Sequence, residues 1–207
     1  MVGGYRHGWA PGGRRAIVGR MDDTDQDLRD LLSEMLQAER EGRRLYDLVR
    51  ADAPEELHAK LIEYAEQARR GALILEEATR RLGGDPDHMS AGARVVRDTT
   101  DALIAATDGA RGRAWMYRAL HLAAFEMRDR MIWRALDALA DQRDDEAGEV
   151  LRTAATAVLS QEALGAHDAD RNEERIAWIM EAMEAQMAAD LGVDGPTGLR
   201  RGLRRPR

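Results

Sequence analysis

Two segments of the chain carry apolar residues at alternating spacings of three and four, and each series is interrupted by acidic residues in the same phase. The first series is Leu28, Leu32, Met35, Glu39, Gly42, Tyr46 and Val49, and the second is Trp115, Ala119, Leu122, Glu126, Asp129, Trp133, Leu136 and Ala140. This spacing keeps side chains on one face of an α-helix, so both segments are predicted to be long helices that bury this face. The carboxylates of Glu39, Glu126 and Asp129 should therefore point into the core.

A buried carboxylate that nothing compensates is too costly to keep, so it must bind a metal, pair with a cation or take up a proton. In the metal interpretation, Glu39, Glu126 and Asp129 form an oxygen-rich site, joined by Glu162 at the edge of the last helix's inner face. Oxygen ligands suit Mn, Mg or Fe better than Cu or Zn. This interpretation gives the chain an Fe or Mn cofactor.

Two interpretations without a metal stay open beside it. In the first, an arginine from a neighbouring helix pairs with an inner carboxylate, and Arg43, Arg130 and Arg175 flank the series and are the candidates. In the second, clustered carboxylates share protons and their pKa values are raised. The sequence does not choose between these three states.

The composition favours an all-helical protein, because Ala, Leu, Glu and Arg dominate and aromatic residues make up only 4%. At 207 residues the chain fits one domain. The absence of Cys excludes disulfides, thiolate metal sites and cysteine nucleophiles. No apolar run reaches the length of a membrane span, and the N-terminus lacks the apolar segment of a signal peptide. We therefore expect a cytoplasmic protein that does not enter membranes.

Charge is distributed unevenly along the chain. Residues 1–20 contain four Arg and residues 200–207 contain five, with no acidic residue in either segment. The other 22 basic residues stand against 38 acidic ones, so the body of the chain is strongly acidic. An acidic body is not a nucleic-acid-binding domain, and only the basic ends could make weak contacts with polyanions or acidic partners.

Turn residues divide the chain into predicted helices. A disordered, basic, Gly-rich segment is expected over residues 1–20, with Met21 as an alternative translation start. Helices are expected over residues 25–50, 54–82, 91–106, 114–141 and 145–191, the last bent near Gly165. Residues 193–207 should form a flexible Arg-rich tail. Short first and last connections and a long middle one, which contains the short helix, are typical of an antiparallel four-helix bundle with one crossover over residues 21–192.

Several motifs of this chain are similar to those of the ferritin-like superfamily, particularly the small bacterial ferritin-like and rubrerythrin-like proteins. They are the Glu-x-x-small-x-x-x-Tyr pattern ending at Tyr46, Glu126, the segment 82–86 and the segment 174–179. The resemblance covers residues 25–190. It implies a di-iron centre with a single Glu from each of two helices and a Glu-x-x-His pair from each of the other two. Glu39 and Glu126 match the single glutamates.

The two Glu-x-x-His pairs are missing. Aligned on the motifs, one pair falls at Ala68 and Gly71 and the other at Asn172 and Arg175, so no histidine stands at either place. We therefore expect a degenerate or absent di-metal centre and a non-catalytic scaffold or interaction protein. The alternative is a carboxylate-bridged Fe or Mn protein with redox or metal-handling activity, and whether the chain is an enzyme stays open.

The resemblance also implies partners. Ferritin-like bundles often associate, so a homo-oligomer is expected. The tail 193–207 contains Gly198-Leu199 and Gly202-Leu203 steps after a Gly-Pro linker. These steps loosely resemble the C-terminal peptides by which ferritin-like cargo docks inside encapsulin shells, which would make the tail a docking site for a protein partner. A plain basic tail is the simpler interpretation.

Overall fold

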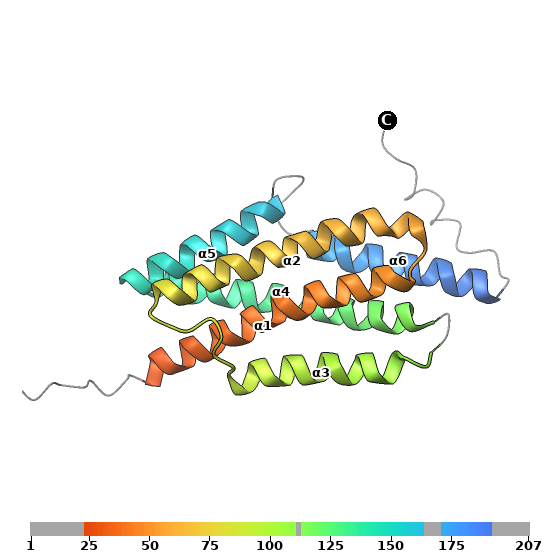
Figure 1. The fold of residues 1–207 in the computed structure, drawn as a ribbon. Helices are drawn as coiled ribbons and strands as arrows, with labels where there is room; N and C mark the ends of the chain where they lie inside the picture. The colour runs from red at the N-terminus through yellow and green to blue at the C-terminus, as the bar shows by residue number, and fades with distance from the viewer. Residues whose placement is uncertain (1–22, 111–112, 164–170, 192–207) are drawn as a thin grey trace, which may run out of the picture.

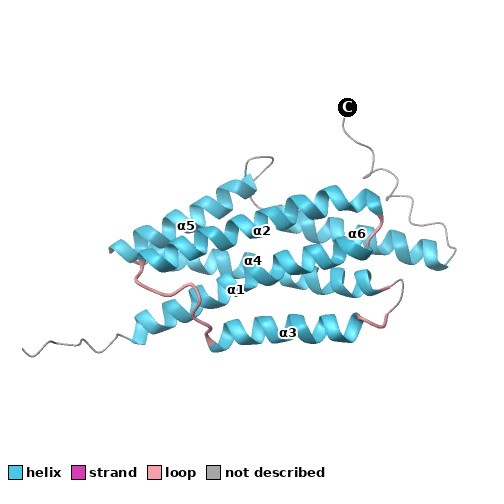
Figure 2. Ribbon diagram, viewed as in Figure 1, coloured by secondary structure: helices cyan, strands magenta, loops and turns pink. Residues whose placement is uncertain are grey.

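Six helices make up nearly all of the described chain in the computed structural model, which describes residues 23–110, 113–163 and 171–191 (Figures 1 and 2). They are α1 (Asp23–Asp52), α2 (Glu55–Arg81), α3 (Ala91–Thr107), α4 (Ala114–Asp141), α5 (Glu146–Ala163) and α6 (Arg171–Leu191). No strand occurs within these ranges. The prediction of an all-α protein is therefore confirmed.

The last expected helix is described as two helices, α5 and α6. The expected bend at Gly165 falls in residues 164–170, which lie outside the described residues. The segments predicted to be a disordered N-terminus (1–20) and a flexible tail (193–207) also lie outside them. The other four expected helices are present, and their ends agree with the prediction to within two residues.

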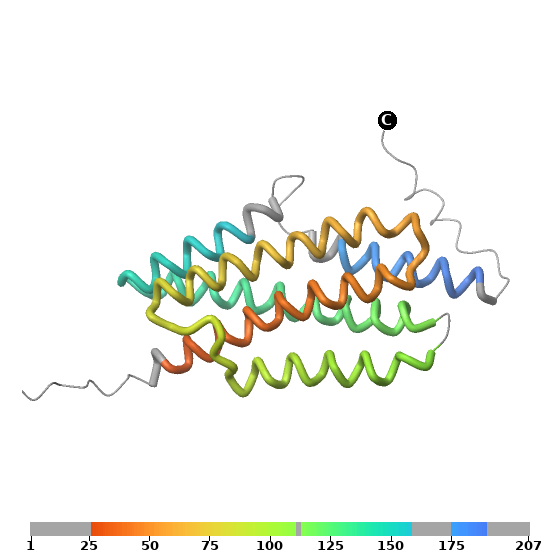
Figure 3. Tube along the Cα trace, in the orientation of Figure 1, coloured from red at the N-terminus to blue at the C-terminus, as the bar shows by residue number. Residues whose placement is uncertain are grey.

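The helices lie side by side with their long axes roughly aligned (Figure 3). Helix α1 packs against α2, α3 and α4, and α4 in turn packs against α5 and α6. Helix α2 also contacts α5. In Figure 1, α3 lies along α1, and α5 and α6 follow one another along the molecule. This arrangement brings α1, α2, α4 and α6 together around the middle of the structure.

The connection from α2 to α3 is tied to α1 by hydrogen bonds. Gly83 has a φ of 70°, a left-handed conformation that glycine adopts readily, and it ends α2. The Ser90 hydroxyl caps α3 by accepting a hydrogen bond of 3.1 Å from the N–H of Ala93. The Ser33 hydroxyl of α1 donates to the carbonyl of His88 at 2.6 Å and accepts from the N–H of Ser90 at 3.0 Å. These bonds fix where α3 begins relative to α1.

The core consists of two large apolar clusters, with polar residues between them. One contains Leu45, Tyr46, Leu61, Trp115, Leu122 and Ile179 with their neighbours, and the other contains Leu32, Met35, Leu75, Trp133, Leu136 and Leu151 with theirs. Glu39 follows Met35 on α1 and precedes Tyr46, and Glu126 lies between Leu122 and Trp133 on α4, so each glutamate falls between the two clusters. Every residue of the two predicted series is buried except Asp129, which is partly buried. The predicted inner faces of α1 and α4 are thus confirmed.

Across the described ranges, none of the helices combines the length and the apolar character that crossing a bilayer requires.

Candidate functional site

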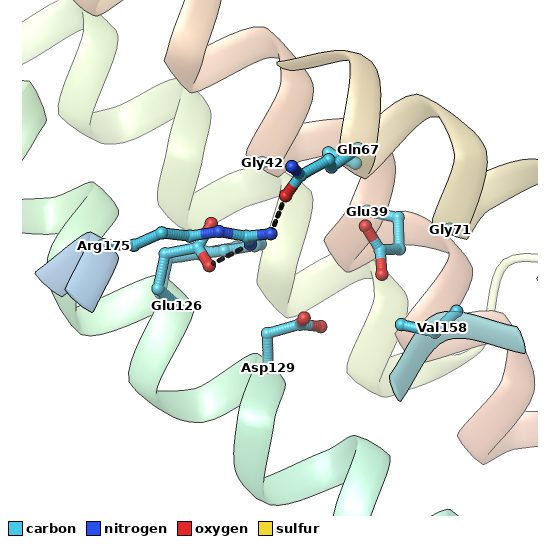
Figure 4. Close-up of a pocket in the computed structure, with 10 residues that line it drawn as sticks. Glu39, Gly42, Gln67, Gly71, Glu126, Asp129, Val158 and Arg175 are labelled. Atoms are coloured by element: carbon cyan, nitrogen blue, oxygen red, sulfur yellow. Dashed lines mark hydrogen bonds and ion pairs between the residues drawn. The ribbon is translucent and has the colours of Figure 1, made fainter. Parts of the chain in front are cut away.

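The inner carboxylates meet at a small cavity between the two apolar clusters (Figure 4). Glu39 comes from α1, whereas Glu126 and Asp129 come from α4. All three line the same cavity of about 30 Å³, together with Gly71 of α2 and Arg175 of α6. A space of this size holds about one water molecule. The three carboxylates that the sequence places on the inner faces therefore line one cavity.

Both carboxylate oxygens of Glu126 are hydrogen-bonded. The hydroxyl of Tyr46 donates to Oε1 at 2.5 Å, and Nη1 of Arg175 donates to Oε2 at 3.0 Å. The Glu126 and Arg175 side chains are only 6% and 9% exposed, so this is a buried ion pair. Burial and the Glu126 charge raise the pKa of Tyr46 well above its usual value, which keeps the phenol protonated as a donor. For Glu126 the structure supports the ion-pair interpretation.

Arg175 joins three helices through its guanidinium. Besides Glu126 on α4, it donates through Nη2 to the side-chain carbonyl of Gln67 on α2. Its guanidinium carbon also lies 4.9 Å from the centre of the Tyr64 ring, a cation–π distance. Tyr64 in turn packs edge-on against Trp178 of α6, with 5.8 Å between ring centres. The cation is therefore held on several sides by groups that suit a positive charge.

Glu39 is compensated differently. Its Oε1 accepts a hydrogen bond of 3.0 Å from the indole N–H of Trp133. Burial raises its pKa well above 4.5, and the negative charge of Asp129 raises it further, whereas the Trp133 bond lowers it. Glu126 raises it as well and Arg175 lowers it, both by less. The neutral, protonated interpretation therefore suits Glu39.

Gly71 makes room for the Glu39 carboxylate. A Cβ atom at position 71 would lie 2.5 Å from Cδ and Oε1 of Glu39 and 2.8 Å from Oε2. Real Cβ atoms essentially never come so close to another heavy atom, so the Glu39 side chain occupies space that any other residue at position 71 would need. The close approach of α1 and α2 at this level depends on the glycine.

The remaining predicted site residues are Asp129, Glu162 and the three candidate arginines. Asp129 is partly buried and lines the cavity. Glu162 lies in α5, but its side chain is outside the described residues. Of the three arginines proposed as partners, Arg175 is bonded to Glu126, Arg43 is exposed and Arg130 is partly buried.

The residues present do not fit the di-metal centre that the family resemblance implies. Gly71 offers no ligand where one histidine is expected, and Arg175 places a cation where the other is expected. The Arg175 guanidinium already occupies an oxygen of Glu126, the residue that would bind the metal. In the described part of the chain, no three His, Cys, Asp or Glu side chains are grouped so that they could hold a metal ion.

Three polar contributions were not predicted from the sequence. The apolar spacing predicts core packing for Tyr46 and Trp133, and both are buried, but each also donates a hydrogen bond to an inner glutamate. Gln67 belongs to neither of the two predicted series. Gln67 lies three residues after Tyr64 on α2, and residues three apart on a helix can contact the same group. Both side chains contact Arg175, so this spacing is the sequence signal that could have indicated Gln67.

Comparison with protein-family models, with curated proteins and with solved structures finds no match to this chain. The fold and the site together define an all-helical protein with a buried polar cluster between two apolar clusters.

Proposed function

We propose that the chain is a non-catalytic scaffold or interaction protein with a ferritin-like four-helix bundle. In this proposal α1, α2, α4 and the α5–α6 pair are the four bundle helices, and α3 belongs to the long crossover between α2 and α4. The packing of α1 on α2 and α4, and of α4 on α5 and α6, supports this assignment. The motifs shared with ferritin-like proteins support it as well.

The buried Arg175–Glu126 pair is the observation that carries the proposal. A guanidinium stays charged at any pH a protein experiences, so it neutralises Glu126 permanently. It also repels a second cation from the same carboxylate. Where a metal would join the helices of a di-metal protein, Arg175 joins α2, α4 and α6 by itself.

A scaffold needs a single rigid packing, and the polar cluster suits that role. Each of its hydrogen bonds forms only when two helices hold one relative position. Any other position would leave a polar group unpaired in the core, which is costly. Tyr46 of α1 bonds to Glu126 of α4, and Trp133 of α4 bonds to Glu39 of α1, so two hydrogen bonds connect these helices. Arg175 connects α6 to both α2 and α4. A sliding or rotated helix would lose these bonds.

The second candidate is a carboxylate-bridged Fe or Mn protein with redox or metal-handling activity. The observation in its favour is that Glu39, Glu126 and Asp129 line one cavity. In this candidate the three carboxylates, which are not grouped closely enough for a metal in this structure, would have to move together to hold it, and the metal would supply Lewis-acid or redox chemistry there. Arg175 would have to leave Glu126 first.

Metal content after loading separates the two candidates. The untagged chain is incubated aerobically with Fe or Mn, desalted and analysed for metal, beside a Glu39→Gln/Glu126→Gln variant. A Glu181→Gln/Glu184→Gln variant, with two exposed carboxylates replaced on α6, reports non-specific surface binding. The scaffold proposal expects all three proteins to retain the same low amount. Near-stoichiometric metal in the parent and the Glu181→Gln/Glu184→Gln control, and none in the Glu39→Gln/Glu126→Gln variant, would refute it in favour of the second candidate.

Thermal denaturation gives an independent readout. A ligand that binds only the folded state raises the melting temperature, and a concentration of about 100 times Kd stabilises by roughly 2.7 kcal/mol. The scaffold proposal expects no such shift with Fe or Mn. A shift that the Glu39→Gln/Glu126→Gln variant abolishes would contradict it.

A further inference from the structure

Helix α4 carries a second apolar face, opposite the one in the core. It consists of Tyr117, Leu120, Ala124, Met127, Met131 and Ala138, all of which are exposed. The four large side chains among them are 53%, 50%, 55% and 68% exposed in chain order. These residues repeat the alternating spacing of three and four, with Arg134 at the one remaining position. The spacing is that of a two-stranded coiled-coil seam.

This outer face differs from the exposed faces of the other long helices. The exposed face of α2, for example, carries Glu56, Glu63, Glu66, Arg70 and Glu77. In a chain with 33% charged residues, a helix face about 31 Å long with a single charged position is unusual. A helix that is apolar on two opposite faces is typical of one that is buried on both sides.

The exposed apolar area is large enough for a stable contact. Each of the four large side chains exposes about half of roughly 200 Å², which together is on the order of 400 Å². The two alanines and the aliphatic stem of Arg134 add to it. Helix α6, which packs beside the N-terminal half of α4, carries two further exposed methionines, Met180 and Met187, and they are not counted in this area. Buried on both copies, the seam removes on the order of 1,000 Å² from water, about the minimum for a specific protein contact.

We propose that a second copy of this chain docks on this face, with the two α4 helices antiparallel about a twofold axis. An antiparallel seam centred between residues 125 and 126 places Ala124 opposite Met127 of the second copy and Leu120 opposite Met131. The same register places Tyr117 opposite Arg134, where a cation–π contact accommodates the one charged position. Large side chains thus meet small or flexible ones, and the twofold axis forms every pair twice.

A second copy suits this face better than the chain's own C-terminal segment. Residues 192–207 contain only three large apolar residues, Val193, Leu199 and Leu203, among Gly, Pro and Arg. Three such residues cannot cover a seam of about 31 Å. The outer face also lies on the opposite side of α4 from Glu126, so the dimer and the proposed function are tested independently.

The first test is the mass of the full chain in solution by light scattering, with Met131→Glu beside it. Val95 on α3 is 66% exposed and Met131 is 68% exposed, so Val95→Glu is a matched control off the seam. We expect a dimer for the parent and for Val95→Glu. Met131→Glu should dissociate, with Kd raised at least about 100-fold, because each dimer would bury two unpaired carboxylates. Both positions are exposed in the single chain, so the circular dichroism should stay unchanged.

The second test uses cysteine cross-linking. The chain contains no Cys, so Ala124→Cys introduces a unique thiol close to the proposed twofold axis. With a short bis-maleimide, which spans the offset between two thiols in successive layers of the seam, we expect Ala124→Cys to form a covalent dimer, and Ala59→Cys, at an exposed alanine of α2, to form none. Adding Met131→Glu to Ala124→Cys should abolish the cross-link.

Three results would overturn the proposal. One is a parent chain that stays monomeric at about 100 µM, a concentration at which even weak dimers associate. Another is a dimer that neither dissociates with Met131→Glu nor cross-links at Ala124→Cys, since the copies would then meet elsewhere. The third is a monomer in which Cys at position 124 resists thiol reagents, because the chain's own undescribed segments would then cover the face.

Discussion

The contact between Gly71 and Glu39 gives the sharpest test of the inner site. In Gly71→Ala the new methyl group would start 2.5 Å from the Glu39 carboxylate, about 1 Å closer than ordinary van der Waals contact allows. The carboxylate cannot simply swing away, because it is buried and bonded to Trp133. Overpacking of this kind costs about 1–3 kcal/mol, and the better helix propensity of Ala returns about 1 kcal/mol. We therefore expect a net loss of up to about 2 kcal/mol.

A double-mutant cycle isolates this contact. In a Glu39→Ala background the methyl group at position 71 has free space, so Gly71→Ala should stabilise the protein by about 1 kcal/mol. The resulting coupling of about 1–3 kcal/mol exceeds the scatter of about 0.3–0.5 kcal/mol between independent sites. The four proteins are compared by urea denaturation followed by circular dichroism. Gly109, where a Cβ atom would meet nothing within 4 Å, provides an uncoupled control. Equal effects of Gly71→Ala in both backgrounds would show that the contact does not exist in solution.

The remaining predictions concern the same cluster. Arg175→Met should lower the free energy of unfolding by about 3–5 kcal/mol, and adding Glu126→Gln should restore most of it, since the first change alone leaves a buried charge. Tyr46→Phe should cost about 1.5–3 kcal/mol in denaturant titrations by removing a hydrogen bond to a carboxylate. Burial raises the pKa of Glu39, so above pH 4.5 the folded state keeps a proton that the unfolded chain releases. Stability should therefore fall as the pH rises from 4.5 through the folded-state pKa, and Glu39→Gln should flatten this slope in unfolding measured from about pH 4 to 8.

The periodic part of this structure could be predicted from the sequence, and the cross-helix pairing could not. Acidic residues in otherwise apolar series were enough to predict that Glu39 and Glu126 lie in the core, because helical phase is a local property. Which of three arginines reaches Glu126 depends on how α6 is rotated relative to α4, and that is set by packing between helices. Asp129 shares the phase of Glu126 but lies closer to the edge of the inner face, so it is only partly buried.

The contacts that accommodate the buried Glu39 carboxylate could not be predicted from the sequence either. They depend on Trp133, a residue 94 positions away, and on the missing side chain of Gly71. A tryptophan in an apolar series predicts packing, and nothing in the pattern indicates where its N–H will point. A glycine inside a predicted helix indicates that another group packs closely against the backbone there, but the sequence does not show which group.

The residues at the two positions where the family resemblance implies histidine each accommodate one inner glutamate. At one position Arg175 supplies a fixed positive charge, which neutralises Glu126. At the other, Gly71 supplies space, which the Glu39 carboxylate fills. A histidine at position 71 would displace Glu39, and a histidine at position 175 would remove the charge beside Glu126. Introducing either histidine alone would therefore disturb a glutamate that a metal centre also needs. Each single change should lower the free energy of unfolding of the protein without adding metal affinity.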